Sequence, residues 1–579
     1  MAKKFLIIDI IPLINLPPQA NDFFSYFSDK KITLGAIVEI EFRKKIIKGY
    51  VLKTEEIEKR RQEIKKYGFN LKPVLKIINQ DPIFLKEQLT LALWLKKFNN
   101  ISLSTSLNMF FIYKQLKLVR KKDFNLVLKS DNKKRKFEIK IKDYLDEKDT
   151  ENKKSLIIVP RDNYLDFLKS KWPYFYFLDN KSFKNIKDVL KLTFSENKIT
   201  LVANKNAIFL PWRNLDQLII FEEGSIFYKE FFKPPFFDWR KIFLKFAKIN
   251  KVRYLIVDQI PSFYLISKNY SLEKKIENIR FDLIKINEKE FEDKITKFKK
   301  NVIFVPEKNL GSKIVCQNCS YSLLCKSCFK FMSLNEKTTY CKYCLKQEKL
   351  PQLCPKCNLK NPWIISHKGA KSIVKYLQFL NRKVYFLEKD SKKIIKNFNK
   401  EEQADLVGSL LVLNPNLKEI EAFFFFNFDE FYFSSDLFQK EKFVRILNFF
   451  KTKSQNLFIV SKVFNPLIEK KFKEGGILNL ILEERKTDKL PPYKRLVILK
   501  EGLINLENLQ KKLTLIRQKL EKLNSEIEIY GPIFANPFKK RKRFFLELVL
   551  KIDPKIDFNL RKILKDIEIE EIDCDALSY

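Results

Sequence analysis

The sequence predicts an α/β protein of several domains that carries a structural zinc region. Its 579 residues are 45% hydrophobic, enough to bury roughly three to five separate cores at typical domain sizes. Short apolar runs such as residues 156–160, Leu-Ile-Ile-Val-Pro, have the length of a buried strand. Eight of the nine cysteines form four Cys-x-x-Cys pairs within residues 316–357. These observations exclude a disordered chain and indicate folded domains around a metal-binding insert.

The chain is strongly basic. It has 113 Lys and Arg against 70 Asp and Glu, so its formal net charge is +43 at pH 7. Such a charge attracts polyanions and makes their binding depend on salt. The enrichment in Lys, Asn, Ile and Phe is also typical of an AT-rich genome, so charge by itself indicates nucleic acid only weakly.

We interpret the amino-terminal apolar run as a buried strand and not as a signal peptide. Asp9 and Pro12 interrupt residues 5–13, and no small-residue cleavage pattern follows. No run approaches the roughly 18 apolar residues of a membrane span, and even the four phenylalanines 423–426 have polar neighbours. We therefore expect a soluble, cytoplasmic protein.

The cysteine pairs predict structural zinc. They are Cys316 and Cys319, Cys325 and Cys328, Cys341 and Cys344, and Cys354 and Cys357. A Cys-x-x-Cys turn presents two thiolates on one side of a tight loop, and two such turns complete a tetrahedral Cys₄ site with no position open for catalysis. Disulfides are the alternative, but nothing else in the chain indicates an oxidising compartment. Cys574 is expected to be an ordinary buried thiol and His367, the single histidine, to be structural or exposed.

Further motifs follow one another in a fixed order. They are residues 24–51 with Phe24-Ser-Tyr26, residues 203–224 ending in Phe221-Glu-Glu-Gly224, the cysteine pairs, Ser366–Leu377, Leu490–Tyr493, Tyr530–Pro532 and Ile572–Asp575. In this order they resemble the primosomal protein N′ (PriA) family of replication-restart helicases, and the resemblance covers almost the whole chain.

The resemblance implies two RecA-like helicase lobes, a small β-rich domain that captures a 3′ end, and an α+β carboxy-terminal domain. The domains expected are 1–112 (3′-end binding), 113–154 (basic connector), 155–310 (first lobe), 311–362 (zinc region), 363–485 (second lobe) and 486–579 (carboxy-terminal DNA-binding domain). It also implies two structural zinc ions. Cys316, Cys319, Cys354 and Cys357 would hold one, and Cys325, Cys328, Cys341 and Cys344 the other.

The sequence departs from this family in the parts that handle ATP. A phosphate-binding loop needs glycines because its N–H groups converge where a Cβ would obstruct them. No glycine lies between Gly68 and Gly224, and the expected loop position, residues 140–154, is polar and charged. In the family's D-E-E-H motif the Mg²⁺-binding Asp is replaced by Phe221, and a phenyl ring cannot bind a hard cation.

Three later motifs of the helicase lobes are also degenerate. Residues 257–262 keep only the end of the family's coupling motif, and residues 405–409 keep a trace of the next strand motif. Residues 448–454 contain neither the glycines nor the arginine finger of the family's Q-x-x-G-R-A-G-R. We predict a non-hydrolysing protein that uses two zinc ions as cofactors and neither ATP nor Mg²⁺.

DNA binding is expected at two basic segments. They are Arg43, Lys44, Lys45 and Lys48 near the amino terminus, and Lys539, Lys540, Arg541, Lys542 and Arg543 near the carboxyl terminus. Such side chains neutralise phosphates without reading sequence, although a charged turn is often merely solvated. Ser25 replaces the family's commonly acidic residue, which weakens the prediction of 3′-hydroxyl recognition. The interval 112–155 is too short for the family's winged helix, so 133–136 belongs to a basic connector that contacts phosphates or only solvent.

Three functions remain in competition. The first is a PriA-like scaffold at stalled replication forks, with branched and single-stranded DNA as its partners and single-strand-binding protein and other primosome proteins as further candidates. The second is an ATP-dependent 3′-5′ helicase with a divergent nucleotide site. The third is a general zinc-bearing nucleic-acid or partner-docking protein. Selectivity that persists at high salt separates the first from the third, and ATP dependence identifies the second.

Overall fold

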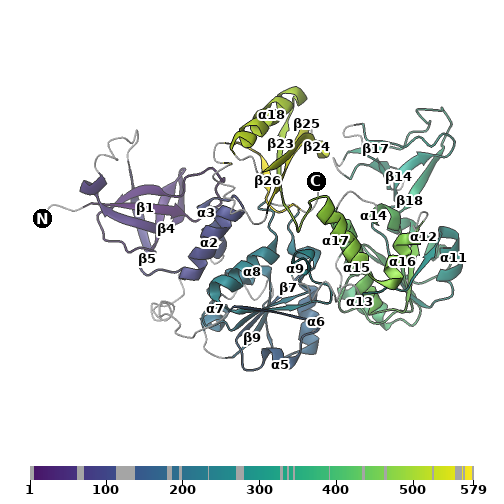
Figure 1. Cartoon of the computed structure of the whole chain (residues 1–579), viewed down its shortest axis with the longest axis horizontal. Helices are drawn as coiled ribbons and strands as arrows, with labels where there is room; N and C mark the ends of the chain where they lie inside the picture. Colours follow the sequence, from purple (N-terminus) through teal and green to yellow (C-terminus); the bar gives the residue numbers. More distant parts are fainter. Residues whose placement is uncertain are drawn as a thin grey trace. The chain divides into compact units, whose positions relative to one another are not determined.

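The computed structural model of the chain describes two compact units, one of residues 1–261 with 557–568 and one of residues 262–556 with 569–579 (Figure 1). The residues described are 5–60, 71–111, 137–178, 186–194, 198–231, 234–268, 279–326, 330–335, 338–342, 346–389, 392–432, 437–461, 466–523, 527–540, 542–553, 564 and 567–576. Within these ranges no helix is long and apolar enough to cross a membrane.

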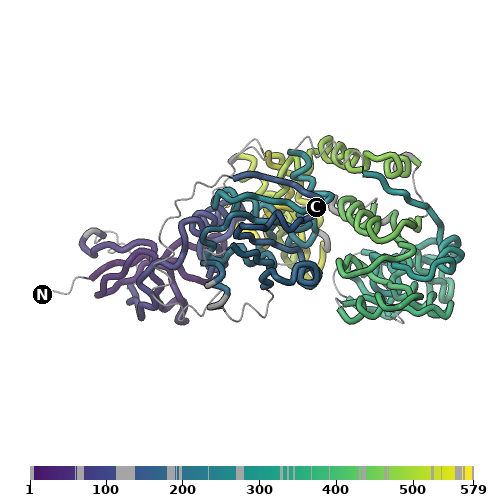
Figure 2. Tube along the Cα trace, turned by 90° about the horizontal axis from the view of Figure 1, so that it is seen from below, coloured from purple at the N-terminus to yellow at the C-terminus, as the bar shows by residue number. Residues whose placement is uncertain are grey.

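The first unit begins with a closed five-stranded barrel. Its strands are β1 (Leu6–Pro12), β2 (Phe24–Ser28), β3 (Ile37–Phe42), β4 (Lys45–Glu56) and β5 (Lys72–Asn79), in the order β1-β2-β5-β3-β4. Inward-facing residues alternate along the strands, so Ile8 and Ile10 of β1 meet Val38 and Ile40 of β3 in a closed core. The barrel is the purple part of the chain in Figure 2. It confirms the predicted small β-rich amino-terminal domain.

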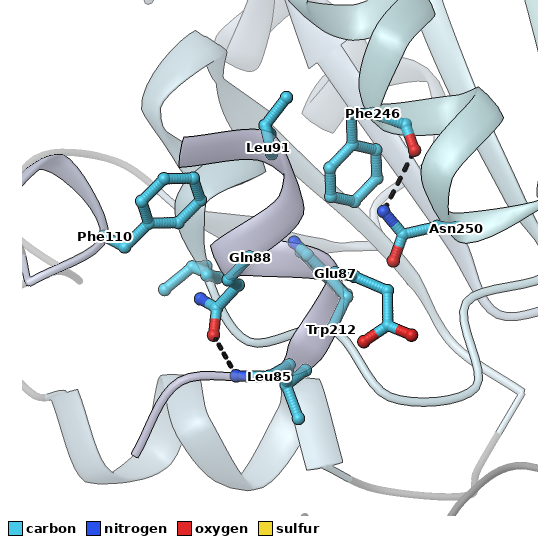
Figure 3. A pocket seen from close by; sticks show the side chains of 9 residues that line it. Leu85, Glu87, Gln88, Leu91, Phe110, Trp212, Phe246 and Asn250 are labelled. Carbon is cyan, nitrogen blue, oxygen red and sulfur yellow. Dashed lines mark hydrogen bonds between the residues drawn. The ribbon is translucent and has the colours of Figure 1, made fainter. Parts of the chain in front are cut away.

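Two helices connect the barrel to a parallel sheet. They are α2 (Lys86–Phe98) and α3 (Leu103–Phe110), and α2 packs beside α8 (Trp239–Asn250) of the sheet layer. The Gln88 side-chain amide donates to the carbonyl of Phe209 at 2.9 Å and its oxygen accepts from the N–H of Leu85 at 2.9 Å. Figure 3 shows this junction, where mainly apolar side chains line a small pocket. Both the nitrogen and the oxygen of the Gln88 amide therefore make hydrogen bonds that hold the start of α2 in place.

The sheet of the first unit is parallel throughout. Its strands are β6 (Glu138–Lys142), β7 (Ser155–Val159), β8 (Tyr176–Leu178), β9 (Thr200–Asn204), β10 (Gln217–Phe221) and β11 (Arg253–Val257), in the order β6-β11-β10-β7-β9-β8. Its other helices are α5 (Glu147–Thr150), α6 (Asn163–Lys171) and α7 (Ile186–Phe194). Ile157, Ile219 and Leu255 are fully buried, as expected where helices cover a parallel sheet.

A second parallel sheet opens the second unit. Its strands are β12 (Leu283–Ile286), β13 (Lys300–Phe304), β19 (Val384–Leu387), β20 (Ala404–Gly408), β21 (Ala422–Phe425) and β22 (Asn456–Val460), in the order β12-β22-β21-β13-β20-β19. Its helices are α9 (Phe263–Ile266), α11 (Glu288–Ile295), α12 (Ala370–Phe379), α13 (Lys392–Lys400), α14 (Phe428–Tyr432), α15 (Leu437–Lys451), α16 (Pro466–Glu474) and α17 (Ile477–Thr487). The four phenylalanines 423–426 are buried at its centre, three of them within β21 and the fourth directly after it.

Two smaller antiparallel sheets complete the second unit. The zinc region contains β14 (Gly311–Cys316), β15 (Ser333–Asn335), β16 (Thr338–Tyr340), β17 (Gln347–Lys349) and β18 (Trp363–Lys368), in the order β17-β16-β15-β14-β18. The carboxy-terminal domain contains β23 (Arg495–Leu503), helix α18 (Leu506–Leu523), β24 (Glu528–Lys540), β25 (Arg543–Ile552) and β26 (Glu571–Asp573), in the order β24-β25-β23-β26. This domain is therefore α+β, as expected.

Several predicted boundaries are wrong. The sequence analysis predicts that residues 138–154 belong to the connector, yet β6 pairs in parallel with β11 and belongs to the first sheet. It also predicts that residues 279–310 belong to the first lobe, yet β12 and β13 belong to the second sheet. The zinc region extends to Lys368, because β18 pairs with β14. In each case long-range strand pairing decides the membership, and local composition does not encode it. The rest of the predicted connector, 113–136 with Lys133–Lys136, lies outside the described residues.

Candidate metal centre and nucleic-acid interface

Four thiols of the zinc region converge on one point. The sulfurs of Cys316, Cys319, Cys354 and Cys357 all lie within 4.8 Å of one another. Cys316 and Cys357 sulfurs are 3.6 Å apart, as are those of Cys319 and Cys354. Zinc–sulfur bonds of about 2.3 Å in a tetrahedron place sulfurs about 3.8 Å apart, whereas a disulfide needs about 2.0 Å. The geometry therefore fits a Cys₄ metal site and not disulfides.

The turns that carry these thiols are alike. In each, the N–H of the first cysteine donates to the carbonyl five residues later, Cys316 to Tyr321 at 2.9 Å and Cys354 to Leu359 at 3.0 Å. The residue after each Cys-x-x-Cys, Ser320 or Asn358, has a left-handed backbone with φ of 57° or 56°. This conformation closes the loop so that both thiols point to the same side.

Two of these thiols have pKa values shifted in opposite directions. The backbone at Leu359 and the side chain of Asn318 lower the pKa of Cys357 to about 6. Desolvation raises the pKa of Cys319 to about 12, and its neighbouring thiols add to this effect. A bound cation would favour the thiolate form of all four, since metal ligation deprotonates a coordinating thiol.

The inner pairs begin with the same turn. Cys325 donates to the carbonyl of Lys330 at 2.8 Å and Cys341 to that of Lys346 at 2.8 Å. Both cysteines are fully buried in one cluster with Ile314. Their predicted partners Cys328 and Cys344 lie outside the described residues. The structure thus brings together the outer four cysteines and gives half of the inner set.

The two remaining candidates stay outside the cluster of four thiols. Cys574 is buried, with its carbonyl accepting from Arg495 at 2.8 Å, in keeping with an ordinary core thiol. His367 lies in β18 opposite Ser312 of β14. Its backbone is part of the zinc-region sheet, which is a structural position.

The amino-terminal basic segment forms a hairpin tip. Phe42 pairs with Lys45, so Arg43 and Lys44 are the two residues of the turn, with φ of 48° and 62°. Arg43, Lys44 and Lys45 are exposed. Lys48 differs, because its ammonium lies 5.6 Å from the centre of the Phe111 ring. Three of the four predicted cations therefore project together from the barrel.

Ser25 has an acidic neighbour that the sequence analysis missed. Asp9 lies directly opposite Ser25 on the adjacent strand, and the Ser25 hydroxyl donates to its carboxylate at 2.6 Å. Arg60 donates to both oxygens of the same carboxylate at 2.8 Å. The sequence signal for this group is a single carboxylate, Asp9, in an otherwise apolar strand. The sequence analysis treats it only as an interruption of the apolar run. The acidic group absent at position 25 is thus present one strand away, although it is buried and charge-paired.

The carboxy-terminal basic segment forms the β24–β25 hairpin tip. Lys540 pairs with Arg543, which leaves Arg541, outside the described residues, and Lys542, with φ of 65°, for the turn. Arg543 pairs with Glu570 at 2.5 Å, which raises the pKa of its guanidinium. This ion pair competes with phosphate contact, so the prediction for Arg543 is weakened. Within the described residues, the cations of this tip that form no ion pair are Lys539, Lys540 and Lys542.

The strand ends of the first sheet are packed with apolar and aromatic side chains. Leu145 follows β6 and is buried in one cluster with Val159, Tyr164 and Phe221. The Tyr164 hydroxyl donates to Glu222 at 2.5 Å, and that of Tyr228 donates to the carbonyls at the ends of β7 and β10. Burial raises the pKa of both tyrosines well above 10, which keeps them neutral donors.

The segment between β6 and β7 is acidic as well as short. Its helix α5 has four residues, and Asp146 and Asp149 lie 3.2 and 2.7 Å from the ammonium of Lys142. Lys142 is therefore balanced by two carboxylates. In open α/β sheets ligands bind outside the carboxyl ends of the strands, and here a phosphate would meet carboxylates and a buried leucine.

The predicted position of the arginine finger is part of a packed helix. Residues 448–451 close α15, and Phe450 is fully buried, stacked on Phe423 with ring centres 3.8 Å apart. This end of the helix serves the core of the second sheet.

Comparisons with known proteins agree with this geometry. Residues 13–111 match the PriA 3′ DNA-binding domain (3′BD). A Helicobacter pylori protein named replication restart protein PriA is 24% identical, over 70% of this chain and 71% of its own length. Proteins of the same name from Buchnera aphidicola and Thermotoga maritima are 24% and 22% identical, over 63% and 65% of this chain and 56% and 55% of their own lengths. The resemblance to PriA is confirmed. The barrel with its basic hairpin tip is thus the part that corresponds to a PriA 3′ DNA-binding domain.

Proposed function

We propose that this chain binds DNA at stalled replication forks for replication restart, as a PriA-like scaffold that does not hydrolyse ATP. The observation that carries the proposal is the match of residues 13–111 to the PriA 3′ DNA-binding domain, on a closed barrel whose β3–β4 turn consists of Arg43 and Lys44. The name of the relatives, replication restart protein PriA, supports the same process. The net charge of +43 supports phosphate binding.

The two parallel sheets are proposed to be degenerate RecA-like lobes that act as supports. Phosphoryl transfer requires a phosphate loop, a carboxylate for Mg²⁺ and an arginine finger. Leu145, Phe221 and Phe450 occupy the corresponding positions, and each is packed in a core. A helicase with a divergent site would need a new phosphate-binding loop elsewhere in the chain.

Two structural zinc ions are proposed for the zinc region. The outer four thiols supply one complete tetrahedral set. The turns at Cys325 and Cys341 repeat the backbone bond of the outer turns, which supports a second set completed by Cys328 and Cys344. Zinc would hold the short strands of this region together, because closed Cys₄ sites stabilise the folded state. Such sites leave no coordination position open for catalysis.

The deciding experiment compares binding of the zinc-loaded chain to a three-way DNA fork and to a plain duplex of equal length, over a salt series without nucleotide. A preference for the fork that persists as salt rises supports the scaffold. Equal affinities that fall together with salt would leave a general nucleic-acid protein that binds through its charge. DNA-stimulated ATP turnover that copurifies with the chain would establish the helicase instead. The same binding assay with single-strand-binding protein added would test that partner.

A further inference from the structure

The tip of the β3–β4 hairpin carries an exposed isoleucine beside its cations. Ile46 is 69% exposed. It follows three exposed cations, Arg43, Lys44 and Lys45. Ile46 pairs with Glu41 of β3, and the residues that alternate with Glu41 along β3 are those buried in the barrel core. The Ile46 side chain therefore lies on the outer face of the barrel. Isolated exposed apolar residues are common on protein surfaces, so the interpretation of Ile46 depends on its surroundings.

The same face of β4 is covered farther from the tip. Tyr50 is buried, with its ring centre 5.4 Å from that of Phe84, which precedes α2. The ammonium of Lys48 lies 5.6 Å from the centre of the Phe111 ring, which follows α3. Alternation along the regular β3–β4 pairing places Tyr50, Lys48 and Ile46 on one face. Within the described part of the chain, the layer that covers this face ends before Ile46.

Strand β2 holds the hairpin tip from the inside of the barrel. The Phe24 ring contacts the Phe42 ring edge to face, with centres 4.9 Å apart, and Phe42 is the last residue before the turn. The Tyr26 hydroxyl donates to the carbonyl of Glu41 at 3.0 Å. Burial raises the pKa of Tyr26 to about 12, so this hydroxyl remains a donor. The backbone that carries Ile46 is therefore held in place, which lowers the entropy lost when a ligand is bound.

Cations lie on both faces of the tip. Lys45 is adjacent to Ile46 in the strand, so its side chain points to the opposite face. On the Ile46 side, the carboxylate of Glu41 lies 2.6 Å from the ammonium of Lys72, which balances its charge. The tip thus combines net positive charge with one uncovered apolar side chain. A branch in DNA has the complementary combination, because two phosphate backbones surround the exposed flat face of its last base pair.

We propose that Ile46 is a wedge that packs against the last base pair at the branch of a DNA fork, with the exposed cations of the tip contacting the flanking phosphates. This inference rests on the proposed fork binding of the chain and assigns the branch point to one side chain. The match of residues 13–111 to a DNA-binding domain favours DNA over a protein partner. DNA-binding proteins insert isoleucine and similar side chains between base steps at the cost of unstacking them. At a branch the stack is already interrupted, so this cost is smaller there. Salt screens charges and not apolar contacts, so the wedge would give a fork preference that persists as salt rises.

The test uses the full chain loaded with zinc and the variant Ile46→Thr, which keeps a β-branched side chain but removes most of its apolar surface. The probes are a three-way fork and a plain duplex of equal length. Each carries a 2-aminopurine, at the branch of the fork and at the centre of the duplex, whose fluorescence rises when the base loses its stacking. The matched control is Leu52→Thr, because Leu52 is 41% exposed on the same strand, about 20 Å from Ile46 at the usual rise per residue.

We expect Ile46→Thr to bind the fork about 10-fold more weakly. Its duplex affinity and salt slope should be unchanged, because no charge is removed. The unmodified chain should raise the fluorescence at the branch, and Ile46→Thr should not. Leu52→Thr should match the unmodified chain, and Ile46→Leu should retain both fork binding and the fluorescence rise. Amide hydrogen exchange of the barrel in each variant checks that it folds, so a folding defect does not decide the result.

Equal losses on fork and duplex in Ile46→Thr, or a loss that Leu52→Thr repeats, would overturn the wedge. If the unmodified chain prefers forks at high salt and Ile46→Thr keeps both that preference and the fluorescence rise, the wedge fails and the proposed function stands. If the unmodified chain shows no preference for forks while Ile46→Thr alone loses the fluorescence rise at the branch, the proposed function fails and the wedge stands.

Discussion

The β3–β4 turn of the barrel allows a test in which stability and affinity should move in opposite directions. Arg43 and Lys44 both adopt left-handed backbones, with φ of 48° and 62°. A two-residue turn of this kind favours Asn-Gly, and a left-handed residue with a Cβ costs about 1–2 kcal/mol. Replacing Arg43-Lys44 by Asn-Gly relieves this strain, while the added glycine loses about 0.5–1 kcal/mol through chain entropy. We expect a net stabilisation of the barrel of about 1 kcal/mol.

The same replacement removes two cations from an exposed tip. Each phosphate contact contributes about 0.9 to the slope of log affinity against log salt on duplex DNA. If both cations contact phosphates, the slope should flatten by about 1.8, and the affinity at low salt should fall evenly across sequences. The salt slope is measured with a labelled fork, and stability is measured by hydrogen exchange of the barrel amides, whose opening should become about fivefold rarer.

A matched control is available in α8. Lys251 is also exposed and left-handed, with φ of 52°, at the carboxyl end of that helix. Lys251→Gly relieves the same strain and removes a charge outside both hairpin tips, so it should slow exchange locally without changing the salt slope. A stabilised Asn-Gly variant with an unchanged slope would show that the tip does not contact phosphates. A destabilised variant would refute the argument that the turn is strained.

Three further outcomes are expected. Cys354→Ser should reduce bound zinc from two ions per chain to one by metal analysis, because it removes one sulfur of the outer set. Phe221→Asp should not create ATP·Mg²⁺ binding in a thermal-shift assay, because Leu145 remains packed where the phosphate loop would lie. Burial raises the pKa of Glu547 to about 7, with Lys500 lowering it in part. The stability from this group is therefore full below its ordinary pKa of 4.5 and is lost as the pH rises through about 7. Glu547→Gln should remove that loss, on the order of 2–3 kcal/mol between about pH 5 and pH 8 in urea unfolding.

The cysteine spacing predicted structural zinc, because each Cys-x-x-Cys turn presents two thiolates and two turns complete a tetrahedral set. The grouping of the outer four cysteines came only from the resemblance to the PriA family. The structure brings the sulfurs of Cys316 and Cys357 to 3.6 Å, as the resemblance to the PriA family implied. The β-rich character of the amino-terminal segment was also predictable, because residues 38–42, Val-Glu-Ile-Glu-Phe, alternate between apolar and acidic side chains. Their burial in the structure follows the same alternation.

The features that the sequence analysis did not predict depend on the register between strands that are distant in sequence. Asp9 meets Ser25 because β1 and β2 are antiparallel neighbours in one specific alignment, and a shift of one residue would place the two side chains on opposite faces. The membership of β6 in the first sheet was missed because Glu-Ile-Lys-Ile-Lys has the composition of a solvated linker. It is an edge strand whose five residues are all exposed or half-buried, which permits that composition.

The proposal that the first parallel sheet is a degenerate nucleotide-binding lobe has a physical argument at its strand ends. In such sheets the crevice outside the strand ends is normally lined by a loop whose backbone N–H groups bind phosphate. Here the segment after β6 is short, and its Leu145 packs with Val159, Tyr164 and Phe221 in one buried cluster. Apolar burial stabilises the folded lobe by about 25 cal/mol per Å² without any bound ligand, whereas a phosphate loop is stabilised only when occupied. In the proposed degenerate lobe, apolar side chains at the strand ends would therefore favour a rigid fold, and we expect that no single residue change would restore ATP binding.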